Sequence, residues 1–222
     1  MTSLAQQALR NAVRTGLILL VFAVIGTAML VWTYQRTQPA IERGQQAAKL
    51  ALLGQVLPHR LYDNDLLASR RDLAPDPRLG TQTPSAMWIA RRGETVTAVV
   101  LEAIAPDGYS GAIRLLIGID AGGTVTGVRV TGHRETPGLG DYIERGKSAW
   151  IEQFAGKSLE RPPAQAWNVR KDGGAFDARA GATITPRAVV KAVSRALEYY
   201  SLNRQAITAL RPVGAAAGSE EN

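Results

Sequence analysis

The longest apolar run of the chain lies near its amino terminus. Between Arg14 and Arg36 there are 21 consecutive uncharged residues, TGLILLVFAVIGTAMLVWTYQ. As an α-helix with a rise of about 1.5 Å per residue, this run spans about 31 Å, which matches the hydrocarbon core of a bilayer. Trp32 and Tyr34 near its end are typical of the membrane interface. A cleaved signal peptide would usually have a shorter apolar region, and no persuasive cleavage site follows Tyr34. The run therefore predicts a single, permanent transmembrane helix.

The charges beside this run predict its orientation. Residues 1–14 contain Arg10 and Arg14 and no acidic residue, so the short amino-terminal end should stay in the cytoplasm. The chain from Arg36 onward would then lie on the outer face, which in a bacterium is the periplasm. The expected location is the bacterial inner membrane, with one pass and a periplasmic main domain.

Beyond the membrane, the hydrophobic pattern changes from helical to alternating and back. Pro58 should end a helix that leaves the membrane, and Met87 should begin a region of strands. A short glycine turn at residues 121–123 predicts a hairpin between the second and third strands. The expected elements are a helix at 39–57, irregular chain at 58–86, strands at 95–105, 112–120 and 124–133, and helices at 141–157 and 186–204.

This pattern predicts an α+β domain, in which helices pack on a small, mostly antiparallel sheet. It also predicts a division of the chain into successive parts. These are a cytoplasmic end at 1–14, a transmembrane helix at 15–35, a membrane-proximal part at 36–86, the main domain at 87–204 and a disordered tail at 205–222.

Composition excludes several classes of function. The 222 residues carry a net charge of +7, but the basic residues are scattered, and no basic run interleaved with aromatic residues indicates nucleic-acid binding. There is no cysteine, and His59 and His133 are the only histidines, so no metal site is expected. GDYIERGKS and FAGKS do not match a phosphate-binding P-loop, because Asp141 and Ile151 stand where its first glycine is required, five residues before the glycine of GKS. Redox chemistry in this chain would therefore need an organic cofactor.

The stretch GATITPRAVVKAV, residues 181–193, places two threonines where a loop becomes a helix. Pro186 suits the first helical position, and Thr185 is a natural N-cap, which alone is a sufficient structural explanation. However, Thr183 lies where backbone N–H groups and the helix dipole favour an anion. Gly181 and Ala182 leave room for a large group near its hydroxyl. The stretch is therefore able to hold a phosphate on or against a threonine.

The run DARAGATIT, residues 177–185, resembles the motif that periplasmic flavin transferases recognise. In that motif an aspartate precedes a Ser/Thr-Gly-Ala-Thr box, whose last threonine receives FMN through a phosphodiester bond. The resemblance makes Thr183 the acceptor and Asp177 the upstream acid, while Ala180 stands where the family often has Ser or Thr.

Two further blocks, APDGYSGAIRLLIGID and GHRETPGLGDYI, resemble the FMN-binding domain of the G subunit of the Rnf electron-transport complex. In ETPGLG, the glycines permit close approach of the backbone to a flat ring, and Leu139 is able to cover one face; an ordinary tight turn is the alternative. His133 and Glu135 suit either an acid–base or a flavin-contact role. The predicted flavin-binding residues are Thr183, Asp177, Gly181, Ala182, Thr185, Glu135, Thr136, Gly138, Leu139 and Lys171; no catalytic or metal-binding residue is predicted.

The resemblance implies a membrane-anchored electron carrier with covalent FMN. It would relay electrons within a complex that couples electron transfer between NADH and ferredoxin to movement of Na⁺ or H⁺, and it would have no turnover alone. The implied partners are the other Rnf subunits, including the flavinylated D subunit, and a flavin transferase. Two alternatives stay open: the C subunit of the sodium-pumping NADH:quinone reductase or another flavinylated relay, and a membrane-anchored assembly module without a cofactor.

Overall fold

The computed structural model describes residues 2–211, which fall into two units divided between Ala48 and Lys49. The first unit is helical and belongs to α1, Thr2–Val56. In the described residues, α1 is the one helix that is long and apolar enough to cross a membrane. Two helices were expected here, but α1 continues through Pro39. Proline removes one backbone donor, and the residues that follow it are good helix formers.

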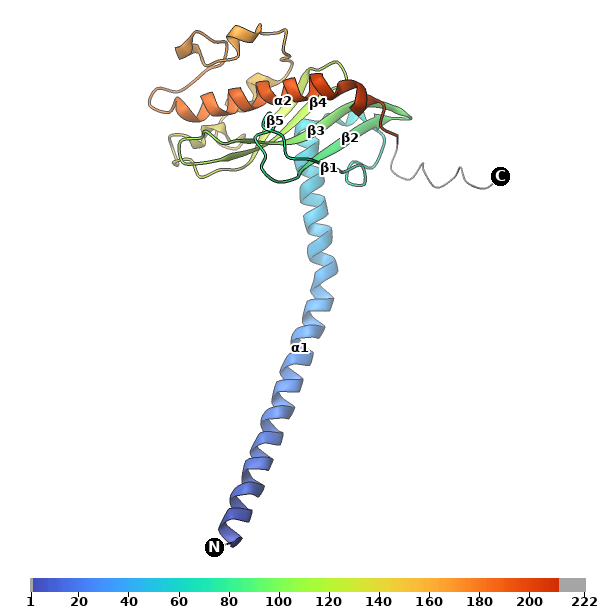
Figure 1. Cartoon of the computed structure of the whole chain (residues 1–222), viewed down its shortest axis with the longest axis vertical. Helices are drawn as coiled ribbons and strands as arrows, with labels where there is room; N and C mark the ends of the chain where they lie inside the picture. Colours follow the sequence, from blue (N-terminus) through green and yellow to red (C-terminus); the bar gives the residue numbers. More distant parts are fainter. Residues whose placement is uncertain (1, 212–222) are drawn as a thin grey trace, which may run out of the picture. The chain divides into compact units, whose positions relative to one another are not determined.

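The second unit contains a five-stranded antiparallel sheet in which the spatial order follows the chain order (Figure 1). The predicted α+β fold is confirmed, and the expected strands and hairpin are present to within one residue at each end. The short edge strand β1 lies in the stretch that was expected to be irregular. The strands are β1 (Arg71–Leu73), β2 (Ser85–Arg92), β3 (Thr95–Ala105), β4 (Ile113–Asp120) and β5 (Val125–Gly132).

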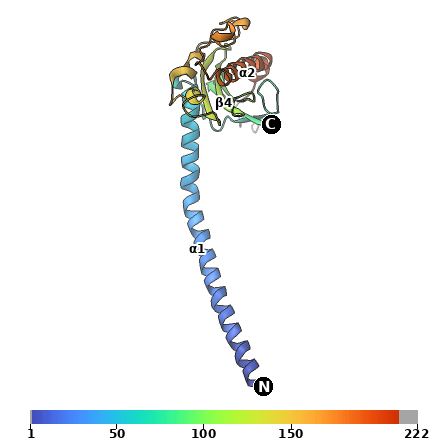
Figure 2. The same cartoon turned by 90° about the vertical axis from the view of Figure 1, so that its left-hand side faces the viewer.

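Both faces of the sheet are covered within this unit. The helix α2, Ile184–Thr208, lies along one face, as Figure 2 shows from the side. Met87, Leu101 and Ile117 belong to the core on this face, and Trp88 and Leu116 belong to the core on the other. This is the expected result of a two-residue side-chain period in strands. Residues 53–57 complete the second core.

Two facing glycines allow the end of α1 to lie directly on the sheet. Gly118 of β4 pairs with Gly127 of β5. A Cβ atom on Gly127 would lie 3.0 Å from the Cα of Val56, and one on Gly118 would collide with the Val56 carbonyl. Thr126 Oγ1 donates a hydrogen bond to the same carbonyl over 2.5 Å. The glycines are therefore required by the close approach of backbone to backbone.

The segment 141–157 was predicted as one helix, and this prediction was wrong. It forms two short 3₁₀ helices, η2 (Asp141–Ile143) and η3 (Ala149–Phe154). Ser148 Oγ accepts a hydrogen bond from the Trp150 N–H and starts η3 anew. Phe154 then packs between aromatic rings of other segments, with its centroid 4.9 Å from that of Phe176. Tertiary aromatic contacts therefore outweigh the helical spacing.

The end of the chain differs from the expectation in one respect. The helix expected at 186–204 is α2, which continues to Thr208, so the first residues of the expected disordered tail are helical. Arg91 is buried and donates hydrogen bonds to the carbonyls of Glu94 and Leu210, which stabilises the chain beyond α2. The expectation for residues 212–222 lies outside the described residues.

Candidate functional site

The beginning of α2 differs from the predicted one. Thr185 was expected to cap the helix and Pro186 to follow first, but α2 begins at Ile184 and Thr183 occupies the N-cap position. Thr185 lies inside the first turn, is 1% exposed, and donates a hydrogen bond from Oγ1 to Glu135 Oε2 over 2.6 Å. The prediction was wrong because this hydroxyl finds its acceptor in a distant loop, which a local capping rule does not consider.

Thr183 does not use its hydroxyl to cap α2. It forms no side-chain capping bond, and it is half-buried. Within residues 2–211 the structure gives no acceptor for the backbone N–H groups of residues 183–185, and Pro186 has no N–H. Unpaired amides at the positive end of a helix dipole favour an anion. The first turn of α2 therefore presents a hydroxyl beside a position that suits a phosphate.

A buried carboxylate joins three segments that are distant in the sequence. Glu135 is 4% exposed; its Oε1 accepts a hydrogen bond from Ser110 N over 3.0 Å, and its Oε2 accepts the bond from Thr185. A Cβ atom on Gly108 would lie 2.9 Å from Oε1, and one on Gly140 would lie 2.7 Å from Oε2. Glycine is therefore required at both positions for the neighbouring loops to close on this carboxylate.

The three segments enclose a cavity of about 360 Å³, which is in the range of small-molecule sites. Three large apolar side chains at this cavity are exposed to solvent: Tyr109 by 68%, Leu139 by 53% and Ile184 by 46%. In the described part of the second unit, only Leu50 and Leu202 are comparable. Exposed apolar groups are thus concentrated around one cavity, which favours an apolar ligand. Its lining consists of Tyr109, Glu135, Thr136, Leu139, Gly140, Gly181, Ala182, Thr183, Ile184 and Thr185.

The chain that leads to Thr183 is held by side chains of η2 and η3. The main chain of Asp177 is bound on both sides: its carbonyl accepts from Trp150 Nε1 over 2.6 Å, and its N–H donates to Gln153 Oε1 over 2.9 Å. The second of the two short helices that replace the predicted long one, η3, thereby fixes the start of the run 177–185.

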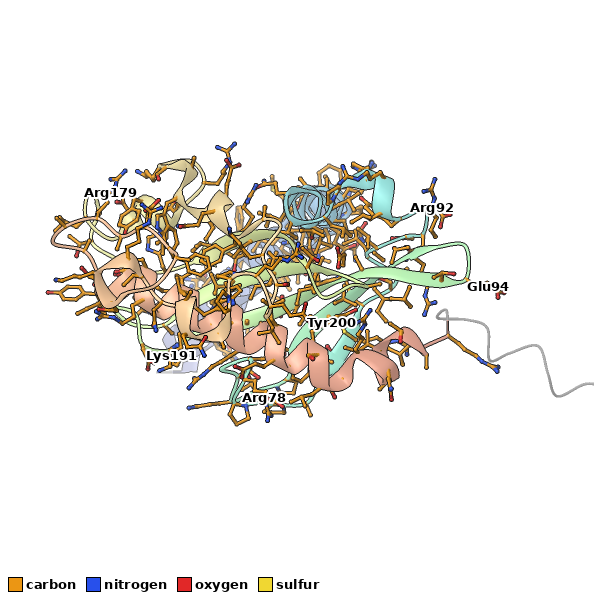
Figure 3. All side chains as sticks on the ribbon, turned by 90° about the horizontal axis from the view of Figure 1, so that it is seen from above. Arg78, Arg92, Glu94, Arg179, Lys191 and Tyr200 are labelled. Carbon is orange, nitrogen blue, oxygen red and sulfur yellow. The ribbon has the colours of Figure 1, made fainter. Side chains whose placement is uncertain are left out.

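Tyr142 holds the next part of the same run. Its hydroxyl accepts a hydrogen bond from Arg179 N over 3.2 Å and donates one to the Ala182 carbonyl over 3.3 Å. The Arg179 guanidinium lies 4.7 Å from the centroid of the Tyr142 ring, at the end of the unit where α2 begins (Figure 3). Burial raises the pKa of the Tyr142 hydroxyl, so it stays protonated and able to donate.

Three predicted site residues do not line the cavity. Asp177 points its exposed carboxylate to Arg170, with Oδ1 3.0 Å from Nε. Lys171 lies exposed in the 3₁₀ helix η5, Arg170–Asp172. Gly138 has a φ of 78°, and its N–H donates a hydrogen bond to Asp141 Oδ1 over 2.8 Å. It therefore shapes the loop that carries Leu139 and Gly140 without lining the cavity itself. The structure brings together the remaining seven predicted residues, all of which line the cavity.

His133 supports the loop that carries Glu135. Its Nδ1 accepts a hydrogen bond from Glu135 N over 3.0 Å, and its Nε2 lies 2.6 Å from Glu144 Oε1. Because Nδ1 is an acceptor, the proton of the neutral ring lies on Nε2 and is donated to Glu144. His133 is not part of the cavity lining.

Sequence reasoning missed two of the lining residues, Tyr109 and Ile184, and gave Gly140 only a role in letting the backbone approach a flat ring. Tyr109 lies in the block GYSGAI, which carried the family resemblance but from which no site residue was predicted. Ile184 carried no such signal, because an apolar residue in an amphipathic helix is normally assigned to the core. No group of three or more metal-ligating side chains occurs in the part of the chain that the structure describes.

The described residues suit FMN. The unpaired amides at the start of α2 match a phosphate, the exposed apolar rim matches a flat ring system, and Gly140 and Gly181 keep side chains out of the space between them. A family model described as an FMN-binding domain matches residues 108–198, which include this entire site. The second unit thus belongs to the class of FMN-binding domains.

The rest of the chain specifies the family further. A second model, the RnfG N-terminal region, matches residues 1–56. The G subunit of the ion-translocating oxidoreductase complex of Pseudomonas aeruginosa is 46% identical over 90% of this chain and 94% of its own length. Proteins of the same name from two other species agree with this. That of Vibrio cholerae (strain O395) is 47% identical over 86% of this chain and 91% of its own length, and that of Cronobacter sakazakii is 49% identical over 85% of this chain and 89% of its own length. The chain belongs to this RnfG family, and the resemblance noted in the sequence is confirmed.

Proposed function

We propose that this chain is the membrane-anchored flavoprotein subunit of an ion-translocating oxidoreductase complex, with FMN bound in the cavity beside Thr183. One observation carries this proposal: an FMN-binding family match coincides with a cavity whose wall combines a helix N-terminus and an exposed apolar rim. α1 supplies the anchor. The family match favours the G subunit of this complex over the C subunit of the sodium-pumping quinone reductase.

The FMN is attached covalently to Thr183 through a phosphodiester. In net terms the bond from Oγ to phosphorus replaces one P–OH bond of FMN, and the hydroxyl proton of Thr183 leaves with that hydroxyl as water, so the product is heavier than the chain by one FMN less one water. Support comes from the flavin-transferase motif at 177–185 and from the hydroxyl of Thr183, which forms no capping bond. The positive end of α2 stabilises the phosphate charge. Outside the cytoplasm, a tether prevents loss of a cofactor that is not readily replaced.

The flavin supplies the redox chemistry, since it exchanges electrons one or two at a time. The protein contributes position and environment. Tyr142, Trp150 and Gln153 hold the tether segment, and Glu135 holds three walls of the cavity together. Tyr109, Leu139 and Ile184 cover ring surface and exclude water. The tether residue, the first turn of α2 and the apolar rim thus act on one bound group.

The domain lies in the periplasm, anchored in the inner membrane with its amino terminus in the cytoplasm. It relays electrons between other cofactors of the complex, which is a translocase coupling NADH and ferredoxin electron transfer to Na⁺ or H⁺ movement, and it has no turnover alone. Its partners are the other subunits, including the flavinylated D subunit, and the flavin transferase that matures it. The arginines of residues 1–14 support the orientation.

The proposal is tested by expressing the full chain with a periplasmic flavin transferase and measuring in-gel flavin fluorescence and intact mass. We expect a fluorescent band carrying one FMN less one water, and its complete loss in Thr183→Ala. Thr95→Ala is the matched control, since Thr95 is an exposed threonine at the start of β3. A dark wild-type band at the unmodified mass would reject the tether and favour a cofactor-free assembly module.

A further inference from the structure

We propose that Glu135 supplies a fixed negative charge that lowers the reduction potential of the flavin, in addition to joining the walls of the cavity. This inference rests on the proposed function. Glu135 was expected to contact the flavin, but both of its oxygens accept hydrogen bonds from the protein, from Ser110 N and Thr185 Oγ1. These two bonds hold the carboxylate in place, so its charge acts on a ligand in the cavity from a fixed point.

The charge of Glu135 is buried and has no cationic partner. The side chain is 4% exposed, its two donors are neutral, and no ion pair to it is found among residues 2–211. A nearby carboxylate provides the contrast. Asp141 is similarly buried, at 7% exposed, but its Oδ2 lies 3.7 Å from Lys147 Nζ. Asp141 also lies outside the cavity lining, whereas Glu135 belongs to it.

A fixed charge at this place opposes reduction. Adding electrons to a group in the cavity makes that group more negative, and a partly desolvated carboxylate beside it raises the free energy of the reduced form. With an effective dielectric constant of about 20, a unit charge at roughly 10 Å changes such an equilibrium by about tenfold. The cavity wall places Glu135 near enough for an effect of this order.

Glu135→Gln separates the charge from the hydrogen bonds. The amide oxygen accepts from Ser110 N, and the amide nitrogen donates to Thr185 Oγ1, which needs only to rotate its own proton. The full-length, flavin-loaded protein in detergent is titrated spectroelectrochemically. We expect the two-electron equilibrium to shift at least tenfold toward reduction, which is about 30 mV in midpoint potential.

Asp141→Asn is the matched control, and we expect it to move the potential by less than a third of the Glu135→Gln shift. A Glu135→Gln midpoint equal to the wild-type value overturns the inference, as does an equally large shift in Asp141→Asn. If Glu135→Gln fails to fold or to carry flavin, Thr136→Lys adds the opposite charge at an exposed lining position without touching Glu135. A raised midpoint potential in that variant supports the inference, because it means that a charge at the cavity lining acts on the flavin. An unchanged midpoint overturns the inference.

The failure of this inference differs from the failure of the proposed function. Wild-type protein without FMN, judged by mass and fluorescence, rejects the function and this inference with it. Flavin-loaded protein whose midpoint is insensitive to the charge at residue 135 rejects the inference alone. Glu135→Ala adds a further distinction, because it removes both hydrogen bonds and should reduce flavin loading as well.

Discussion

In the sheet, strands β2 to β5 bury apolar side chains in regular alternation, whereas residues 135–183 contain neither a strand of the sheet nor an α-helix. The first region is stabilised by many interchangeable contacts. The second also buries an aromatic cluster around Phe154, but its path toward Thr183 is set by a few specific hydrogen bonds from buried side chains such as Glu135, Tyr142 and Trp150. A stable scaffold and a positioned site are therefore separate properties, and mutations should affect them separately.

The largest effect on stability is expected in the sheet. Ile117 is fully buried in β4, facing α2. Ile117→Ala removes apolar contacts and leaves a cavity, so the free energy of unfolding should fall by about 2–5 kcal/mol in urea titrations. The visible circular dichroism of the attached flavin should match that of the wild type in the remaining folded protein. A changed flavin spectrum with little loss of stability would contradict the separation of the two regions.

A smaller effect on stability, with a larger effect on the site, is expected for Tyr142→Phe. The change keeps the ring and removes two hydrogen bonds to the tether segment, at a cost of about 1–3 kcal/mol. The segment before Thr183 gains freedom, so the visible circular dichroism and the fluorescence anisotropy of the flavin should both decrease.

Tyr200→Phe is the matched control. Tyr200 is 1% exposed, and its hydroxyl has no hydrogen-bond partner among the described residues. It lies 17 residues after Thr183 in the sequence, which is about 25 Å along α2 at the helical rise of about 1.5 Å per residue. Its loss should leave the flavin signals unchanged. Equal flavin signals in Tyr142→Phe and the wild type would show that Tyr142 has no positioning role.

The same contrast explains which features were predictable. Strands 95–105, 112–120 and 124–133 were predicted nearly to the residue because burial on both faces follows from a local two-residue period. The helix expected at 141–157 failed because Ser148 and the aromatic cluster around Phe154 impose 3₁₀ turns. Local periodicity contains no information about contacts between residues far apart in the chain.

The site was predictable as a pair of sequence blocks but not as a geometry. GATIT and ETPGLG both line the cavity, as their joint assignment to a flavin site required. The hydrogen bond that unites them, from Thr185 to Glu135, was not foreseen, and Thr185 was assigned to a cap instead. A buried pair separated by 50 residues has no signature in one sequence. The roles of individual residues toward FMN stay predictions for these variants to test.

The smallest effect is expected for an exposed ion pair beside the site. Arg187, in the first turns of α2, donates to both carboxylate oxygens of Asp172 in η5, over 2.7 and 2.9 Å. The hydrogen bond from Arg187 lowers the pKa of Asp172 below its ordinary value of 3.8. A lowered folded-state pKa means that the contribution to stability is present at neutral pH and is lost as the pH falls through that pKa.

Asp172→Asn should therefore lower the thermal midpoint by roughly 1–2 °C at pH 7, since exposed pairs are screened by solvent. The difference from the wild type should diminish in scans at successively lower pH below 3.8. Flavin circular dichroism should be unchanged throughout, because neither Asp172 nor Arg187 lines the cavity. A flavin signal that changes in this variant would show that the Asp172–Arg187 pair helps to position the site although neither residue lines the cavity.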